Sequence, residues 1–102
     1  MLSIFPDDPS ALNSYAWRMA EIESNLEDAL LKARKAVVLT ADDPNRQAGI
    51  IDTEAEVLWK MSRFDEAIES IERAISIEPG NKYFKNQNEK FIETKKTTTK
   101  SA

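Results

Sequence analysis

The sequence predicts an all-α protein built as one domain. Only two of its 102 residues are glycine, which argues against the many turns of a β protein. Residues of high helix propensity dominate instead. Apolar side chains recur at intervals of three and four residues, the period of an amphipathic helix. With 41% hydrophobic and 31% charged residues, the composition is that of a soluble, globular chain rather than a disordered one.

The first helix is expected from about Pro9 to Glu23, after an N-terminal arm at residues 1–7. Asp8 is a suitable N-cap because its carboxylate can accept from the free N–H groups of the first turn. Pro9 fits the first helical position, where no N–H is needed. The apolar stripe of this helix consists of Leu12, Ala16, Met19 and Ala20.

The second helix is expected to begin after the break at Ser24-Asn25 and to end near Thr40. Its apolar stripe consists of Leu26, Ala29, Leu30, Ala33, Ala36 and Val37. The next five residues, 41–45, read Ala-Asp-Asp-Pro-Asn, which is a stop and loop signal.

The third helix is expected from about Arg46 to Met61, and a short turn at Ser62-Arg63 separates it from the fourth. One face of the third helix carries Ile51, Ala55, Leu58 and Ser62, and the fourth carries Phe64, Ala67, Ile68, Ile71, Ala74 and Ile75. The fourth helix should end at Pro79-Gly80, because proline and glycine together stop a helix.

A fifth helix is expected from about Asn81 to Thr94, with a thinner apolar stripe of Phe84, Phe91 and Ile92. Gln87 and Asn88 stand where apolar residues would be expected. A helix with one modest apolar face suits the end of a stack, where its outer side meets water. Residues 95–102 are basic and rich in threonine, and they are expected to form a disordered tail.

The two helix pairs are related by an internal repeat with an offset of 38 residues. This offset matches Leu26 with Phe64, Ala29 with Ala67, Leu30 with Ile68, Ala33 with Ile71, and Ala36 with Ala74. Alanines at matching positions allow antiparallel helices to approach closely, and pairs that cannot bury their apolar faces alone must stack.

These residues resemble the tetratricopeptide repeat (TPR) family. The stretch from Phe64 to Pro79 looks like the second half of such a repeat, with an aromatic Phe64 in the turn, Ala67 and Ala74 seven apart, and Pro79 five further on, and residues 48–79 meet the spacings of the family fully. Residues 10–44 are similar but degenerate, since Leu26 replaces the aromatic residue. Residues 13–17, Asn-Ser-Tyr-Ala-Trp, are similar to the opening helix of bacterial repeats. The resemblance implies a right-handed α-solenoid domain at residues 8–94, with two helix hairpins and a capping helix at about 81–94.

The resemblance also implies a concave groove lined by the first helix of each pair. The residues that would face this groove are Ser14, Arg18, Glu21, Ile22, Asp52, Glu56, Trp59, Lys60 and Asn86. A peptide or helix could dock against Trp59, with Arg18 and Lys60 taking acidic groups and Asp52 or Glu56 taking basic ones. The alternative is that these are ordinary surface residues and that Trp59 belongs to the core.

The sequence offers little for catalysis or for a cofactor. It has no cysteine and no histidine, which removes the common zinc sites, thiol chemistry and the usual proton shuttle at neutral pH. Asp52 and Glu56 share one helix face and could act as an acid–base pair, but such a pair is more often a solvated surface. We therefore expect neither enzymatic activity nor a metal or cofactor. A clamp for the terminal carboxylate of chaperone tails is also disfavoured, because Ser14, Arg18, Gly49, Asp52 and Thr53 occupy the matching positions.

The charge is unevenly distributed. Residues 1–81 carry 8 basic and 16 acidic side chains, and residues 82–102 carry 6 basic and 2 acidic ones. The acidic body argues against nucleic-acid binding. The absence of a secretory signal and of a membrane-spanning segment favours the cytoplasm.

The expected function is a scaffold-type interaction module that binds a protein or peptide. The alternatives are homo-oligomerisation, because two repeats are short of the usual three, and a role as an accessory domain of a larger protein.

Overall fold

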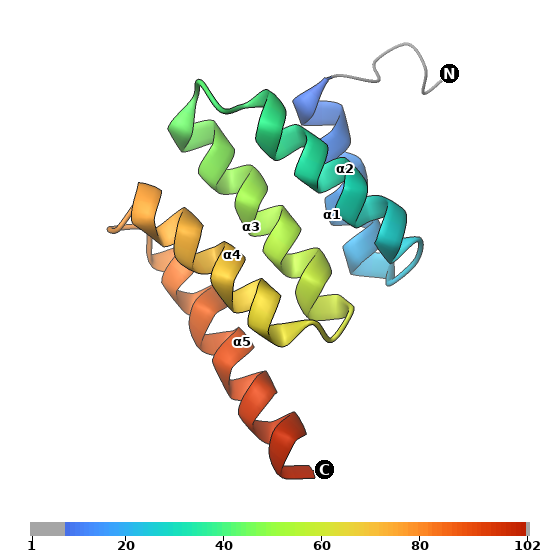
Figure 1. The fold of residues 1–102 in the computed structure, drawn as a ribbon, viewed down its shortest axis with the longest axis vertical. Coiled ribbons are helices and arrows are strands. Elements are labelled where there is room, and N and C mark those ends of the chain that lie inside the picture. The colour runs from blue at the N-terminus through green and yellow to red at the C-terminus, as the bar shows by residue number, and fades with distance from the viewer. Residues whose placement is uncertain (1–7, 102) are drawn as a thin grey trace.

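The computed structural model describes residues 8–101, and within them the fold is all-α, as the sequence predicts, with no strand. The helices are α1 (Pro9–Ile22), α2 (Leu26–Leu39), α3 (Pro44–Lys60), α4 (Phe64–Ile77) and α5 (Lys82–Ser101). In Figure 1, α2, α3 and α4 lie side by side, with α1 behind α2 and α5 behind α4. The arm expected at residues 1–7 lies outside the described residues.

The start and end of α1 follow from local chemistry. The Asp8 side chain accepts a hydrogen bond of 3.1 Å from the backbone N–H of Ser10, and Pro9 occupies the first turn, as predicted. Glu23 and Asn25 then adopt left-handed backbone angles, with φ near 50°. This conformation is uncommon outside glycine, and it separates α1 from α2 within a few residues.

Helix α3 begins two residues earlier than the sequence predicts. The Asp43 side chain accepts a hydrogen bond of 3.3 Å from the N–H of Arg46, and Pro44 lies in the first turn. The Asp-Pro pair therefore starts α3 in the same way that Asp8 and Pro9 start α1. Pro44 acts as a helix opener here, because a proline in the first turn leaves no hydrogen bond unmade.

Helix α5 continues well beyond the predicted end at Thr94. It runs to Ser101, so the disorder expected for residues 95–102 is wrong for residues 95–101, and residue 102 lies outside the described residues. Neither glycine nor proline interrupts the helix between Lys82 and Ser101. Lys95 also forms an ion pair with Asp65 of α4, which ties this part of α5 to its neighbour.

Alanines form much of the core. Ala29, Ala36, Ala67 and Ala74, which the 38-residue offset aligns, are all fully buried, as predicted. Each helix packs against the next in the chain, and α1 also packs against α3. Small side chains at these contacts allow close approach, so larger groups at the same positions would push the helices apart.

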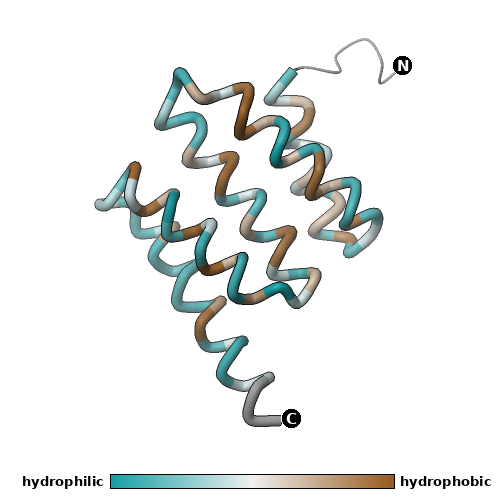
Figure 2. The backbone as a smooth tube through the Cα atoms, viewed as in Figure 1, coloured by the Kyte–Doolittle hydropathy of each residue, from teal (hydrophilic) through white to brown (hydrophobic). Residues whose placement is uncertain are grey.

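The last helix differs from α2, α3 and α4 in the hydropathy of its residues. Figure 2 shows hydrophobic residues recurring along α2, α3 and α4, whereas α5 is mostly hydrophilic. Phe84 and Phe91 are the large apolar side chains that α5 buries, and the polar Gln87 is buried between them. These three residues lie on one face of α5, at intervals of three and four residues. A polar group in that position needs a hydrogen-bond partner.

Candidate functional site

Two acidic side chains of α3 are buried rather than solvated. Asp52 and Glu56 are 5% and 8% exposed, and they lie on the same helix face because they are four residues apart. The interpretation of this pair as a solvated surface is therefore wrong. Side chains of α5 reach this face of α3 and bond to both carboxylates.

Gln87 joins the two carboxylates. Its Nε2 donates a hydrogen bond of 3.1 Å to Asp52 Oδ1 and another of 3.0 Å to Glu56 Oε1. A side-chain amide nitrogen carries two hydrogens, so Gln87 can satisfy both acceptors at once. This explains why a glutamine stands in the apolar stripe of α5, at a position where the sequence pattern alone favours an apolar residue.

Lys90 adds an ammonium group to this pair. Its Nζ lies 3.2 Å from Glu56 Oε1 and 4.1 Å from the centroid of the Trp59 ring. The Trp59 ring is in turn 5.9 Å from that of Phe91. Charge-assisted hydrogen bonding and cation–π attraction therefore act on the same lysine. We call the set Asp52, Glu56, Trp59, Tyr83, Gln87 and Lys90 the α3–α5 cluster.

The cluster alters the acidity of Asp52. Burial raises the pKa of the Asp52 carboxyl to about 6, because the ionised form loses its water, and the nearby charge of Glu56 adds to the rise. Hydrogen bonding from Gln87 and Tyr83, together with the charge of Lys90, acts in the opposite direction. Burial and the two carboxylates likewise raise the pKa of the Tyr83 hydroxyl to about 12.

The remaining residues of the predicted groove lie apart from this cluster or at its edge. Arg18 and Glu21 are exposed on α1, and Asn86 is exposed on α5. Trp59 is half-buried. Lys60 is partly buried, 3.7 Å from Glu23, and this ion pair links the C-terminal ends of α1 and α3. Ser14 and Ile22, also on α1, are exposed.

Sequence reasoning missed Tyr83, Gln87 and Lys90 as partners of the acidic pair. The available signal was Gln87 itself, because a polar residue midway between Phe84 and Phe91 shares their buried face. Its partners lie more than thirty residues earlier in the chain, so the spacing of residues could not identify them.

A third buried carboxylate lies on a different face of α3. Glu54 Oε2 accepts a hydrogen bond of 3.1 Å from Arg34 of α2, and Glu54 Oε1 accepts one of 3.4 Å from Arg73 of α4. Glu54 is buried, whereas the two arginines are about half exposed. The carboxylate therefore links three neighbouring helices, and the arginines keep part of their hydration.

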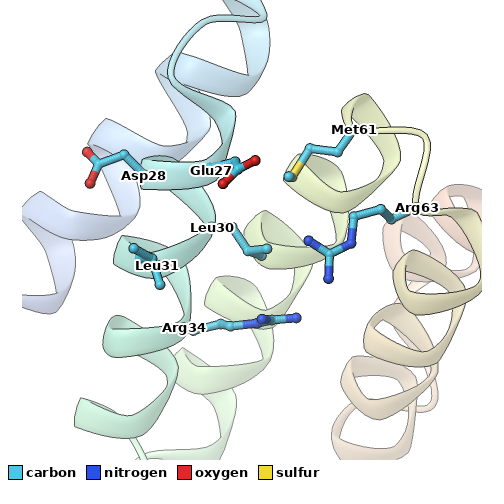
Figure 3. Close-up of a pocket in the computed structure, with 7 residues that line it drawn as sticks. All are labelled: Glu27, Asp28, Leu30, Leu31, Arg34, Met61 and Arg63. Carbon is cyan, nitrogen blue, oxygen red and sulfur yellow. The ribbon is translucent and has the colours of Figure 1, made fainter.

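A surface pocket of about 390 Å³ lies between α2 and the turn that joins α3 to α4. The side chains of Arg34 and Arg63 extend toward one another across it (Figure 3). Glu66 holds Arg63 through two hydrogen bonds of 2.7 and 2.8 Å. The lining residues are Glu27, Asp28, Leu30, Leu31, Arg34, Met61 and Arg63, so none of the predicted groove residues takes part.

The described residues 8–101 contain no group of three or more His, Cys, Asp or Glu side chains that could hold a metal ion. In the same part of the chain, none of the helices is both long and apolar enough to cross a membrane. Comparison of the chain with family models, with curated proteins and with solved structures gave no match.

Proposed function

We propose that this chain is a TPR-like interaction module that binds a peptide or a partner helix on the face formed by α1, α3 and α5. Three features support a stack of helix hairpins: the 38-residue repeat, the burial of the aligned alanines, and the packing of α1 against both α2 and α3. In such a stack, the first helix of each pair lines one continuous surface.

Trp59 is the observation that carries the proposal. It is a large aromatic residue that stays half-buried on α3, and the ammonium groups of Lys60 and Lys90 lie 5.1 and 4.1 Å from its ring centroid. Tryptophan is among the residue types that contribute most to binding energy, because it offers a large apolar area together with a polar N–H group. Its position suits an anchor for an apolar side chain of the ligand.

The charges around Trp59 favour a ligand with acidic groups. Asp52 and Glu56 bond to Gln87 and Lys90 within the chain, so they are poor partners for basic groups of a ligand. The Lys60–Glu23 pair is long at 3.7 Å, and its glutamate is exposed. Such pairs contribute little and exchange readily with a competing carboxylate. Together with exposed Arg18, Lys60 would hold acidic residues that flank the apolar anchor.

Selection from a random peptide library on the 102-residue chain tests this proposal. We expect enriched peptides to combine an apolar residue with acidic neighbours. Trp59→Ala should weaken their binding at least about tenfold, since loss of an interface anchor costs about 2 kcal/mol or more. Leu31→Ala on α2 is the matched control, because it also removes a large apolar side chain, and it should bind as the wild type does. Unchanged binding to a folded Trp59→Ala variant would contradict the proposal.

Self-association through α2 is a second candidate function. Leu31 and Val38 are 65% and 72% exposed, and their separation of seven residues places them on the same face of the helix. Exposed aliphatic residues in a row are typical of a helix–helix contact between copies. Sedimentation velocity over a concentration series distinguishes self-association from peptide binding. A wild-type chain that dimerises, together with Leu31→Lys and Val38→Lys variants that stay monomeric, would favour self-association.

A further inference from the structure

The contacts between α5 and α3 combine polar and apolar side chains. Gln87 and Lys90 bond to the buried carboxylates, and the stacking of Phe91 on Trp59 adds an apolar contact. Beyond these side chains, α5 packs against α4. The docking of α5 onto α3 therefore depends in part on the charge state of the carboxylates that Gln87 and Lys90 contact.

The charges in this cluster do not balance when both carboxylates are ionised. Lys90 reaches Glu56, whereas the Asp52 carboxylate accepts from uncharged donors, the amide of Gln87 and the hydroxyl of Tyr83. Two buried negative charges are then set against one positive charge. Burial of an unpaired charge is unfavourable, and a proton on Asp52 would remove the excess.

We propose that α5 is a proton-dependent clasp on α3, which docks more tightly when Asp52 carries a proton and opens more readily when Asp52 is ionised. Opening uncovers Asp52, Glu56 and Trp59 on α3. The hinge is the short connection of residues 78–81, which contains Pro79 and Gly80.

The direction of the pH dependence follows from the two states. Burial and the charge of Glu56 raise the pKa of the docked Asp52 carboxyl, whereas Gln87, Tyr83 and Lys90 of α5 lower it, and the net result is a pKa of about 6. In the open state the carboxyl meets water, and its pKa returns to the ordinary value of 3.8. Docking is therefore most favourable below pH 3.8 and weakens as the pH rises through 6. Between pH 5 and pH 8, the opening constant should increase about tenfold.

Hydrogen exchange of the full chain, followed by NMR at pH 5 to 8, tests the clasp. After correction for intrinsic exchange rates, we expect the amides of α5 up to Thr94 to open more easily than those of α1 and α2. Their opening should also depend less steeply on urea, because only part of the chain opens. The opening constant should rise about tenfold from pH 5 to pH 8 in the wild type.

Asp52→Asn provides the decisive comparison, since it keeps the acceptor oxygen for Gln87 and removes the charge. Its α5 opening constant should not change with pH, and at pH 5 it should already lie about tenfold below the wild-type value, because Asp52 of the open wild type is mostly ionised there. Asp42→Asn is the control, because Asp42 is exposed in the loop before α3, and it should behave as the wild type does.

Two results of the hydrogen-exchange experiment would overturn the proposal. The first is that the amides of α5 open with the same free energy and the same urea dependence as those of α1 and α2. In that case α5 would not open independently of the rest of the chain. The other is a wild-type opening constant that does not change with pH. If Asp52→Asn fails to fold, carboxyl ¹³C titration of Asp52 in the wild type decides the matter. A midpoint near 6 supports the clasp, and a midpoint near 3.8 rules it out.

Discussion

Gln87 of α5 donates a hydrogen bond of 3.1 Å to Asp52 of α3, a residue thirty-five positions earlier in the chain. Replacement of Gln87 by Leu removes this donor and leaves a buried carboxylate without it. We expect a loss of about 1–3 kcal/mol in the free energy of unfolding at pH 7, the usual effect of an unsatisfied buried acceptor. Urea unfolding measures it, and Asn86→Leu, at the exposed neighbouring position, should change stability far less. Equal effects of the two substitutions would mean that the hydrogen bond contributes nothing specific.

Asp52→Asn should make the protein more stable at neutral pH. Because burial raises the pKa of the Asp52 carboxyl to about 6 from 3.8, the stability that it contributes is present below pH 3.8 and is lost as the pH rises through 6. The full difference corresponds to roughly 3 kcal/mol. The variant should therefore exceed the wild type in unfolding free energy at pH 8 and match it more closely at pH 4. A stability difference that does not vary with pH would contradict this assignment.

The Arg34–Glu54–Arg73 link should respond asymmetrically to substitution. A double variant that carries both Arg34→Met and Arg73→Met leaves the Glu54 carboxylate buried and unpaired. We expect a cost of about 3 kcal/mol. Glu54→Met leaves two half-exposed arginines that water can solvate, so it should cost about 1 kcal/mol or less. Chemical unfolding of the two variants at pH 7 checks the order, and the reverse order would show that Glu54 is not effectively buried.

The alanines of the repeat should tolerate no enlargement. Ala67 is fully buried, and Ala67→Leu should cost about 1–3 kcal/mol because the added atoms separate packed helices. Ala41→Leu adds the same atoms at an exposed loop position and should stay within about 0.5 kcal/mol of the wild type. Thermal unfolding compares the two. If Ala67→Leu were as stable as the control, the close helix contact at this position would be disproved.

Local signals in the sequence predicted much of the helical framework. The Asp8-Pro9 pair and the Pro79-Gly80 stop gave element boundaries, because capping depends on neighbouring residues alone. The aligned alanines were correctly assigned to the core. Pro44 was misjudged because Asp-Pro can end one element and begin the next. Whether the hairpins stack as a TPR solenoid stays a prediction.

The candidate site was harder to predict from the sequence. The spacing of Asp52 and Glu56 identifies a shared helix face, but it does not reveal what covers that face. The cover comes from Gln87 and Lys90 of α5, and long-range contacts of this kind leave only a weak trace in the sequence. That trace is the position of Gln87 between Phe84 and Phe91 in the apolar stripe of α5.

Chemical-shift mapping of a selected peptide on the ¹⁵N-labelled chain tests the proposed function most directly. Binding to the face of α1, α3 and α5 predicts perturbations centred on Trp59, Lys60 and Arg18, including the indole N–H of Trp59. Perturbations confined to the pocket around Leu31 and Arg63 would instead place the binding surface on the α2 side and contradict the proposal.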